Sequence, residues 1–390
     1  MPEAPAPPPR IPFNKPFVAG KELFYIAQAV TKGNLGGDGF YTRACCRLME
    51  ERFGVPHVLL TPSCTASLEM AATLCGFEPG DEVILPSYTF VSTASAFVRA
   101  GAKPVFVDVR PDTLNIDETQ IEAAVTERTR AICVVHYAGI ACEMDTILAI
   151  AERNGLRVVE DAAQGVNAFY KGRALGSMGD LGCYSFHETK NLICGEGGAL
   201  CINDPALLRR SEILRDKGTN RQAFFRGDVD KYTWVDVGSS YVPSEITSAF
   251  LYAQLEEMDR ITRRRAEIFR RYAEGLAPEV AAGRLRPPHA PAGCVGNHHL
   301  FYAILASTEA RDAALEAFRA ANIQAVFHYV PLHAAPMGRE LAGGRSLPVT
   351  EDLAARLLRL PMFFDLTETE QDRVIATFRG FLAGGPPPDA

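Results

Sequence analysis

The alternation of short apolar runs with helical patterns between residues 57 and 203 constrains the fold of this chain more than any other feature. The runs have the length and the β-branched content of buried strands, and helical spacing fills most of the gaps between them. The predicted strands are His57–Thr61, Glu82–Ser87, Lys103–Val109, Ala131–Tyr137, Arg157–Asp161, Gly182–Phe186 and Ala199–Asn203. The predicted helices include Thr65–Leu74, Val91–Arg99, Ile116–Ala124 and Met144–Arg153. This order predicts an α/β fold with a large, mostly parallel seven-stranded sheet, helices on both faces, and ligands at the carboxyl ends of the strands.

A smaller α/β unit is predicted after the sheet. We expect a large domain over residues 11–255 and a small C-terminal domain over residues 256–383, with disordered tails at 1–10 and 384–390. The small domain is predicted to contain strands His298–Leu305 and Ile323–Val330, a helix over Ala310–Ala320, and helices near Glu351–Arg359 and Thr367–Leu382. Acidic residues interleave the arginines of Glu256–Gly275, which favours a solvated connecting helix over a nucleic-acid surface.

The overall composition excludes several classes of function. A formal net charge of -7 over 390 residues argues against nucleic acid as the main partner. There is no run of about eighteen apolar residues that would suit a membrane span. The 10 cysteines include no C-x-x-C pair, which predicts reduced thiols, a cytoplasmic location and no metal site.

A single lysine stands between two of the predicted strands. The apolar run 181–186 is followed by a polar turn that carries Lys190, and glycines then lead into the next run. An amine held partly out of water has a lowered pKa and becomes a nucleophile that can form a Schiff base. For an isolated lysine, a solvated loop side chain is the alternative.

A second polar group follows the strand about thirty residues upstream. In the sequence RVVEDAAQG, Asp161 ends the strand and Gln164 follows it. A carboxylate there suits the cationic ring nitrogen of pyridoxal 5′-phosphate (PLP), and the amide suits the phenolic oxygen of the same ring. A helix cap is the alternative for Asp161 alone. Together, however, Asp161 and Lys190 indicate a PLP site more specifically than either residue alone.

Two further segments have possible ligand-binding roles. Residues 63–66 open a helix directly after a strand, so that free backbone N–H groups and the hydroxyl of Thr65 could bind a phosphate dianion. An ordinary Ser/Thr helix cap is the alternative there. The glycine-rich loop Gly33–Gly39 lacks a P-loop pattern, and it is either a mobile loop near the substrate or plain turn chemistry.

The chain resembles the DegT/DnrJ/EryC1/StrS family of nucleotide-sugar aminotransferases from about Ile11 to Phe381. The matching segments are TPSCTASLEM at 61–70, PSYTFVSTASAF at 86–97, EDAAQG at 160–165, SFHETKN at 185–191 and GEGGA at 195–199. Within the family it is most similar to the WecE-type dTDP-4-amino-4,6-dideoxygalactose transaminases. The segments that fit this subgroup are IPFNKP, GDGFYTR, RGDVDKYTW, GSSY and FHYVPLH.

The resemblance implies the type I fold of PLP-dependent transferases and a role for each matched residue. Lys190 is expected to bind PLP covalently and then to move the proton. Asp161 and Gln164 are expected to contact the pyridine ring, with Phe90 stacked on its face (a core phenylalanine is the alternative reading). The expected phosphate contacts are Thr65, Ala66, Ser185 and Ser240. Many relatives have Asn where this chain has Ser240, and that Asn reaches the cofactor of the neighbouring subunit, so a homodimer is expected.

The resemblance also implies the substrates. L-Glutamate is expected to donate its amine and leave as 2-oxoglutarate, and the pyridoxamine phosphate form of the cofactor then aminates C4 of dTDP-4-keto-6-deoxy-D-glucose. The galacto product is expected from the WecE likeness, and the gluco product and the pathway stay open. The candidate substrate contacts are Asn14, Lys15, His187, His328, Tyr329 and His333. His187 could also act as an acid or base, and we expect Trp234 to be a packing residue.

Three rival functions differ from this interpretation. A related dehydratase would have His in place of Lys190. A sugar-nucleotide-binding regulator without PLP would not need the set of Lys190, Asp161, Gln164, Thr65 and Ser185 that the chain retains. A nicotinamide oxidoreductase would show G-x-G-x-x-G after a strand, and this chain does not.

Overall fold

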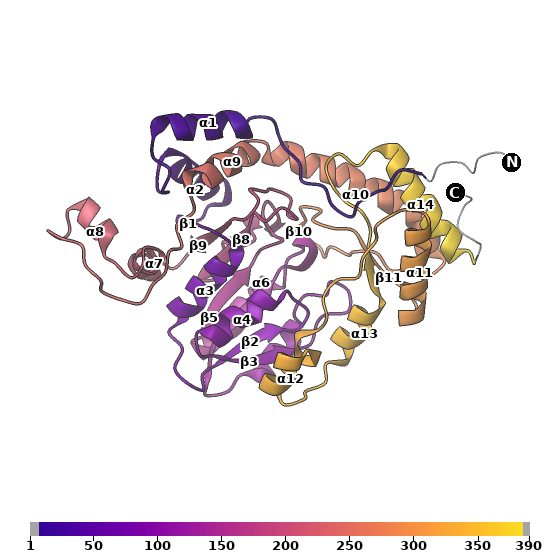
Figure 1. Cartoon of the computed structure of the whole chain (residues 1–390). Coiled ribbons are helices and arrows are strands. Elements are labelled where there is room, and N and C mark those ends of the chain that lie inside the picture. The colour runs from indigo at the N-terminus through magenta and orange to yellow at the C-terminus, as the bar shows by residue number, and fades with distance from the viewer. Residues whose placement is uncertain (1–7, 385–390) are drawn as a thin grey trace.

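The computed structural model describes residues 8–384, and the parts of the predicted tails at 1–7 and 385–390 lie outside the described residues. Its centre is a seven-stranded sheet in the order β1-β9-β8-β5-β4-β2-β3 (Figure 1). The strands are β1 His57–Thr61, β2 Glu82–Pro86, β3 Lys103–Val107, β4 Thr129–Val135, β5 Arg157–Asp161, β8 Leu181–Ser185 and β9 Gly198–Ile202. Strand β9 runs antiparallel to both neighbours and the other pairs are parallel, which confirms the mostly parallel sheet.

Helices cover both faces of this sheet because successive side chains of each buried strand point to opposite faces. In β4, Ile132 and Val134 belong to one core cluster, whereas Ala131 and Cys133 belong to the other. The first face packs against α2 Phe40–Phe53, α6 Met144–Asn154 and α9 Glu245–Glu256, and the second against α3 Cys64–Cys75, α4 Val91–Arg99 and α7 Leu208–Arg215. The remaining short elements of this part are α1 Glu22–Lys32, α5 Ile121–Ala124, α8 Arg221–Arg226, β6 Phe169–Tyr170 and β7 Arg173–Ala174.

One predicted helix of this part is shorter than expected. The prediction of a helix over Ile116–Ala124 is wrong in its first half, because Ile116 forms an antiparallel bridge with Val109. The side chain of Asp117 then accepts a hydrogen bond from Thr119 N–H and caps a 3₁₀ turn, Glu118–Gln120. Only α5 is α-helical there.

The C-terminal region begins with the long helix α10, Met258–Ala281, which runs from the end of α9 to α14, Glu368–Leu382 (Figure 1). Its other elements are β10 Cys294–Val295, β11 Tyr302–Ile304, α11 Thr308–Ala320, α12 Pro336–Ala342, α13 Pro348–Arg356 and β12 Leu357–Arg359. The predicted strand His298–Leu305 is shorter than expected. His298 has a φ of 54°, outside the extended region, and the carbonyls of His298 and His299 accept hydrogen bonds from the Arg265 side chain and not from a neighbouring strand. The predicted strand Ile323–Val330 is absent, and only isolated bridges form at Ile323 and Val326.

The N-terminal segment packs against this C-terminal region. Ile11 is fully buried in its core cluster and pairs with Ile323. Residues that precede it also make contacts, since the carbonyl of Pro8 accepts a hydrogen bond from the Asn322 side chain at 2.8 Å. The chain therefore brings residues 11–14 to the boundary between the sheet and the C-terminal region.

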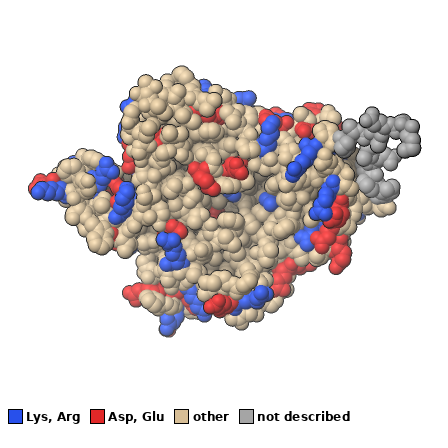
Figure 2. All heavy atoms as spheres, viewed as in Figure 1, with Lys and Arg blue, Asp and Glu red and all other residues tan. Residues whose placement is uncertain are grey.

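The outer surface carries acidic and basic side chains mixed over the face seen in Figure 2, with a hollow near its middle. The segment that carries α8 projects away from the body (Figure 1). Within residues 8–384, no helix is both long and apolar enough to cross a membrane.

Candidate active site

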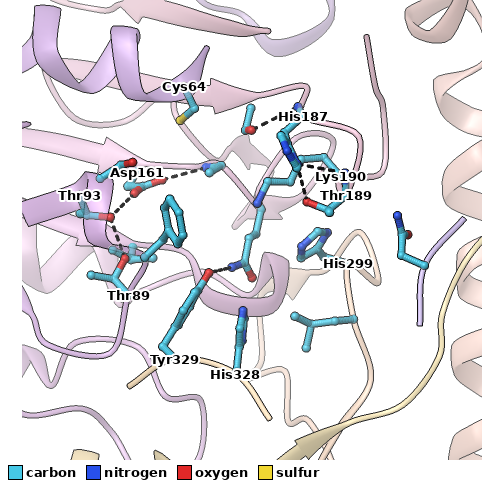
Figure 3. A pocket seen from close by; sticks show the side chains of 18 of the residues that line it. Cys64, Thr89, Thr93, Asp161, His187, Thr189, Lys190, His299, His328 and Tyr329 are labelled. Carbon is cyan, nitrogen blue, oxygen red and sulfur yellow. Dashed lines mark hydrogen bonds between the residues drawn. The ribbon is translucent and has the colours of Figure 1, made fainter. Parts of the chain in front are cut away.

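A cavity of about 550 Å³ lies where β4, β5 and β8 end, and residues of the C-terminal region close its other side (Figure 3). This is the edge of the sheet where the sequence predicted ligands. The predicted site residues that line it are Asn14, Thr65, Phe90, Asp161, Gln164, Ser185, His187, Lys190, His328 and Tyr329. The fold thus brings most of the predicted site together in one place.

Lys190 lies in the loop that joins β8 to β9. Backbone hydrogen bonds close this loop tightly, from Lys190 N–H to His187 O and from Glu188 N–H to Gly195 O, both 2.9 Å long. Gly195 has a φ of 81°, in the left-handed region that glycine adopts without strain. Burial lowers the pKa of the Lys190 amine, which makes more of it available as an uncharged nucleophile.

The end of β5 is fixed by the fully buried carboxylate of Glu160. This carboxylate accepts hydrogen bonds from His136 Nε2 at 2.8 Å and from the backbone N–H groups of Gly176 and Gly179 at 2.8 and 2.7 Å. Burial alone would raise the pKa of Glu160, but these hydrogen bonds lower it below the usual range. An ionised, fully bonded Glu160 therefore holds the next residue, Asp161, in a defined position.

Asp161 presents a second buried carboxylate to the cavity. Its Oδ2 accepts a hydrogen bond from Thr93 Oγ1 at 2.7 Å, and its Oδ1 accepts one from Ala163 N–H at 3.1 Å. Burial raises its pKa, although the hydrogen bond from Thr93 acts in the other direction. In the part of the chain that the structure describes, no Lys, Arg or His forms an ion pair with Asp161. The carboxylate is therefore suited to a cationic group of a ligand.

The amide of Gln164 has a fixed orientation. Its Oε1 accepts a hydrogen bond from Ala138 N–H at 2.7 Å, so its Nε2 is the donor and contacts the hydroxyl of Tyr329 at 2.9 Å. The Tyr329 ring stacks on His328 with a centroid distance of 3.6 Å. Residues from opposite sides of the cavity are thereby connected, and Gln164 offers an N–H donor to an oxygen on a ligand.

The start of α3, residues 63–66, forms a concave part of the cavity wall together with Ser92, which we call the cup. Ser63 caps the helix by accepting a hydrogen bond from Ala66 N–H, and the Thr65 hydroxyl lies 2.8 Å from the Ser92 hydroxyl. Gly198 of β9 packs so closely that a Cβ there would be 2.4 Å from the carbonyl carbon of Ser63. A helix start with hydroxyls around it attracts a phosphate. Ala66 itself does not line the cavity, and its N–H is already bonded to Ser63.

Three predicted contacts line the cavity and are at least partly exposed to solvent. Phe90 precedes α4 and is 56% exposed, so the alternative of a core phenylalanine is wrong. His187 Nδ1 lies 2.9 Å from the Thr189 hydroxyl. Asn14 donates a hydrogen bond to Glu188 O at 3.2 Å, which ties the N-terminal segment to the lysine loop.

Other predicted residues lie away from the cavity of this chain. Lys15 pairs with Asp365 at 3.0 Å on the surface. His333 is buried between the Ser87 hydroxyl and Glu351, so its position does not support the predicted substrate contact. Ser240 lies in the segment between α7 and α9, outside the cavity.

The prediction that Trp234 is a packing residue is wrong within this chain, because its side chain is 78% exposed. The loop Gly33–Gly39 joins α1 to α2 and does not line the cavity either.

The structure adds residues that the sequence did not indicate. The most notable are Thr93, Arg265, His299 and Arg359. Burial lowers the pKa of Arg265 to about 10 and lowers that of Arg359 as well. Neither guanidinium pairs with a carboxylate in residues 8–384, and Arg359 Nε has no hydrogen-bond partner there. The C-terminal side of the cavity is consequently suited to anionic ligands.

Comparison with known proteins identifies the family. The model of the DegT/DnrJ/EryC1/StrS aminotransferase family matches residues 19–379. The chain belongs to this family. Aminotransferases of the family use PLP, and the protein is accordingly a PLP-dependent aminotransferase with the type I fold.

Solved structures of similar proteins agree with this assignment over nearly the whole chain. The aminotransferase TlmJ from Streptoalloteichus hindustanus has a TM-score of 0.89 at 31% identity, covering 96% of this chain and 100% of TlmJ. DesV from S. venezuelae, in complex with a ketimine intermediate, has a TM-score of 0.87 at 31% identity, covering 96% and 99%. The putative sugar aminotransferase Spr1654 from Streptococcus pneumoniae, in its PMP form, has a TM-score of 0.88 at 26% identity, covering 96% and 98%.

The cavity of this aminotransferase has the hydrogen-bonding groups that PLP requires. A buried carboxylate without a cationic partner, Asp161, suits the protonated pyridine nitrogen, and the Gln164 amide suits the ring hydroxyl. The cup around Thr65, together with the hydroxyl of Ser185 in the cavity wall, suits the phosphate. When bound, PLP supplies the ring that withdraws electrons from the reacting carbon. The residues present therefore fit the cofactor of the family.

Proposed function

We propose that the protein transfers the amine of L-glutamate to C4 of dTDP-4-keto-6-deoxy-D-glucose and forms dTDP-4-amino-4,6-dideoxy-D-galactose. The observation that carries this proposal is that Lys190 and Asp161 reach one cavity from the ends of two strands, beside the start of α3 and its hydroxyl groups. A relative named as a putative sugar aminotransferase supports a sugar as the acceptor. The segments that resemble the WecE type support the galacto product.

Each residue of the cavity has a proposed task. Lys190 binds the cofactor and, once free, moves a proton from the donor carbon and later returns one to the sugar carbon. Asp161 keeps the pyridine nitrogen protonated, and Thr93 orients that carboxylate. Because glutamate and the sugar nucleotide are both anionic, Arg265 and Arg359 favour the entry of each in turn. One site then serves both halves of the reaction.

The product of the complete reaction tests this proposal. The purified enzyme is incubated with L-glutamate and the keto sugar, and the configuration at C4 is read from NMR coupling constants, with the Lys190→Ala variant as control. An axial amine at C4 is expected. An equatorial amine would replace the galacto product by the gluco alternative, and amination at C3 would contradict the proposed position of transfer.

We also propose that the protein is a homodimer and that the segment around α8 packs on the second subunit. This segment projects from the body, and its apolar side chains Phe225, Trp234 and Val237 are 62%, 78% and 58% exposed (Figure 1). Apolar surface of this kind usually marks an interface. Packing there would carry Ser240 towards the partner's cofactor.

Light scattering tests the dimer. The wild-type protein is expected to have the mass of two chains. Trp234→Asp is expected to have the mass of one chain and to lose most of its activity, because a charge replaces a ring that the proposed interface would bury. Trp234→Phe is the matched control and should remain a dimer. A wild-type monomer with full activity would refute the proposal.

The 10 free thiols, most of them in the sheet and its helices, support a cytoplasmic location.

A further inference from the structure

The segment 297–299 crosses the C-terminal side of the cavity and is held more firmly than a surface loop. Asn297 Nδ2 donates hydrogen bonds to the carbonyls of Gln164 and Val166 at 2.7 and 2.8 Å. Buried Arg265 donates from Nε to His298 O at 3.0 Å and from Nη2 to His299 O. These contacts hold His298 at its positive φ of 54°, which such a residue rarely adopts. They set the position of the next side chain, His299.

The His299 ring lies in the wall of the cavity near Lys190 and is 8% exposed (Figure 3). Its Nδ1 lies 2.9 Å from Oδ1 of Asn191, the residue that follows the lysine. Asn191 Nδ2 donates to Asn297 O at 3.0 Å, so the amide nitrogen is already committed and Oδ1 is the atom that faces the ring. An amide oxygen only accepts, and His299 Nδ1 must therefore carry the hydrogen.

A neutral imidazole with its hydrogen on Nδ1 has a lone pair on Nε2. Burial, together with the positive charges of Lys190, Arg265 and Arg359, lowers the pKa of His299 well below its usual value, so the ring stays neutral. Its Nε2 forms no hydrogen bond with any residue from 8 to 384. At this position the cavity wall thus presents a neutral acceptor close to several basic side chains.

We propose that His299 binds the substrate through this unprotonated Nε2, which accepts a hydrogen bond from a sugar hydroxyl next to the carbonyl carbon, and that Asn191 sets the required tautomer. The proposal rests on the proposed sugar substrate. A hydroxyl is favoured over the ammonium of the amino donor because the nearby guanidinium groups of Arg265 and Arg359 repel an ammonium group. The nearness of His299 to Lys190 selects a hydroxyl close to the reacting carbon.

Two substitutions separate this role from a structural one. In His299→Asn the side-chain amide can still donate to Asn191 from the place of Nδ1, but nothing replaces Nε2. In His299→Gln the longer amide reaches the place of Nε2, but the hydrogen bond to Asn191 is lost. A residue that only supports the loop would tolerate Asn and not Gln, whereas a substrate acceptor predicts the reverse.

The two half-reactions are followed separately by the visible absorbance of the holoenzyme in stopped flow. For His299→Asn, we expect kcat/KM with the keto sugar to fall about 10-fold and the reaction with L-glutamate to change by less than about 2-fold, as for one lost hydrogen bond. His299→Gln should keep the sugar reaction within about 3-fold of wild type. Equal losses in both half-reactions of His299→Asn, or a larger loss in His299→Gln than in His299→Asn, would overturn the proposal.

A substrate analogue that lacks the hydroxyl next to the carbonyl completes a double-mutant cycle. With this analogue the wild-type enzyme should lose about the same factor as His299→Asn loses with the full substrate, and His299→Asn should lose little more. Independent losses that multiply would contradict a direct contact. Nitrogen-15 NMR of the imidazole, assigned by comparison with His299→Asn, should show hydrogen on Nδ1, and hydrogen on Nε2 would also overturn the proposal.

The failure of this inference is distinguishable from the failure of the proposed function. If the wild-type holoenzyme reacts with L-glutamate but not with the keto sugar, the proposed substrate is wrong. In that case the imidazole tautomer still tests whether Asn191 sets the state of the ring. If the wild type reacts with both substrates, the two variants, the double-mutant cycle and the tautomer together decide the role of His299.

Discussion

Replacement of Lys190 with alanine is expected to lower the rate of amine transfer by about 10⁴-fold or more. The amine of Lys190 is the proposed attachment point of the cofactor and the proposed proton carrier, so its loss affects both halves of the reaction. The rate is measured as 2-oxoglutarate formed in the presence of the keto sugar. Lys190→Arg is the matched control, since it keeps a positive charge but cannot form the covalent bond, and it should be equally inactive. Activity of Lys190→Ala within about 100-fold of wild type would contradict the assignment.

The same substitution should not destabilise the protein without cofactor. The pKa of Lys190 in the folded chain is below its usual value of 10.5. The unfolded chain therefore binds this proton more tightly, so the ammonium costs the folded state free energy at neutral pH, and this cost disappears as the pH rises above 10.5. The melting temperature of the cofactor-free Lys190→Ala variant should thus equal or exceed that of the wild type at pH 7. A clear decrease would mean that Lys190 supports the fold.

Replacement of Asp161 with asparagine is expected to lower kcat/KM for both half-reactions by about 10³-fold, comparable to the loss of a preorganised electrostatic contact. Asparagine has nearly the same shape, but it carries no charge to keep the ring nitrogen of the cofactor protonated. The variant should still bind PLP through Lys190 and the phosphate cup, so the visible band remains while turnover is lost.

Thr93→Val is the control for the second prediction. It removes the hydrogen bond to Asp161 Oδ2 but leaves the charge, and we expect a loss of about 10-fold. A Thr93→Val enzyme slower than Asp161→Asn would show that orientation matters more than charge. Asp161→Asn with activity near that of wild type would remove the carboxylate from the proposed mechanism.

The strands of the sheet could be predicted because two-sided burial makes each of them a short apolar run. β1 and β5 have the predicted bounds, and the other strands differ by one or two residues at their ends. The segment Ile323–Val330 is also rich in apolar and β-branched residues, yet it forms only isolated bridges, and Phe327 and Val330 are 52% and 60% exposed. Composition alone does not distinguish a buried strand from an extended segment that borders a cavity.

The two strand-end residues Asp161 and Lys190 were predictable because parallel strands bring their carboxyl ends together. The site residues of the C-terminal region were harder to predict from the sequence, because only the tertiary fold brings them to the sheet. Arg265 did leave one signal, since it lies on the apolar stripe of α10 with Ile261 and Ile268. A charged residue on a buried stripe requires a hydrogen-bond partner. Here two backbone carbonyls accept hydrogen bonds from Arg265, and the guanidinium also borders the cavity.

His299 and Arg359 left no such signal. The ring of His299 is positioned by Asn191, more than one hundred residues away, and its tautomer follows from hydrogen bonds of an amide. Arg359 ends a short strand in a run of leucines, where sequence spacing does not indicate what it faces. Their roles depend on the packing of the C-terminal region against the lysine loop.

The attachment site of the cofactor tests the central claim most directly. The purified holoenzyme is reduced with borohydride, which makes the bond between cofactor and lysine irreversible, and the digested peptides are then analysed by mass spectrometry. The phosphopyridoxyl mass should be found on Lys190, and prior conversion of the enzyme with L-glutamate should prevent the labelling. A label on another lysine, or an active enzyme that takes up no label, would contradict the account.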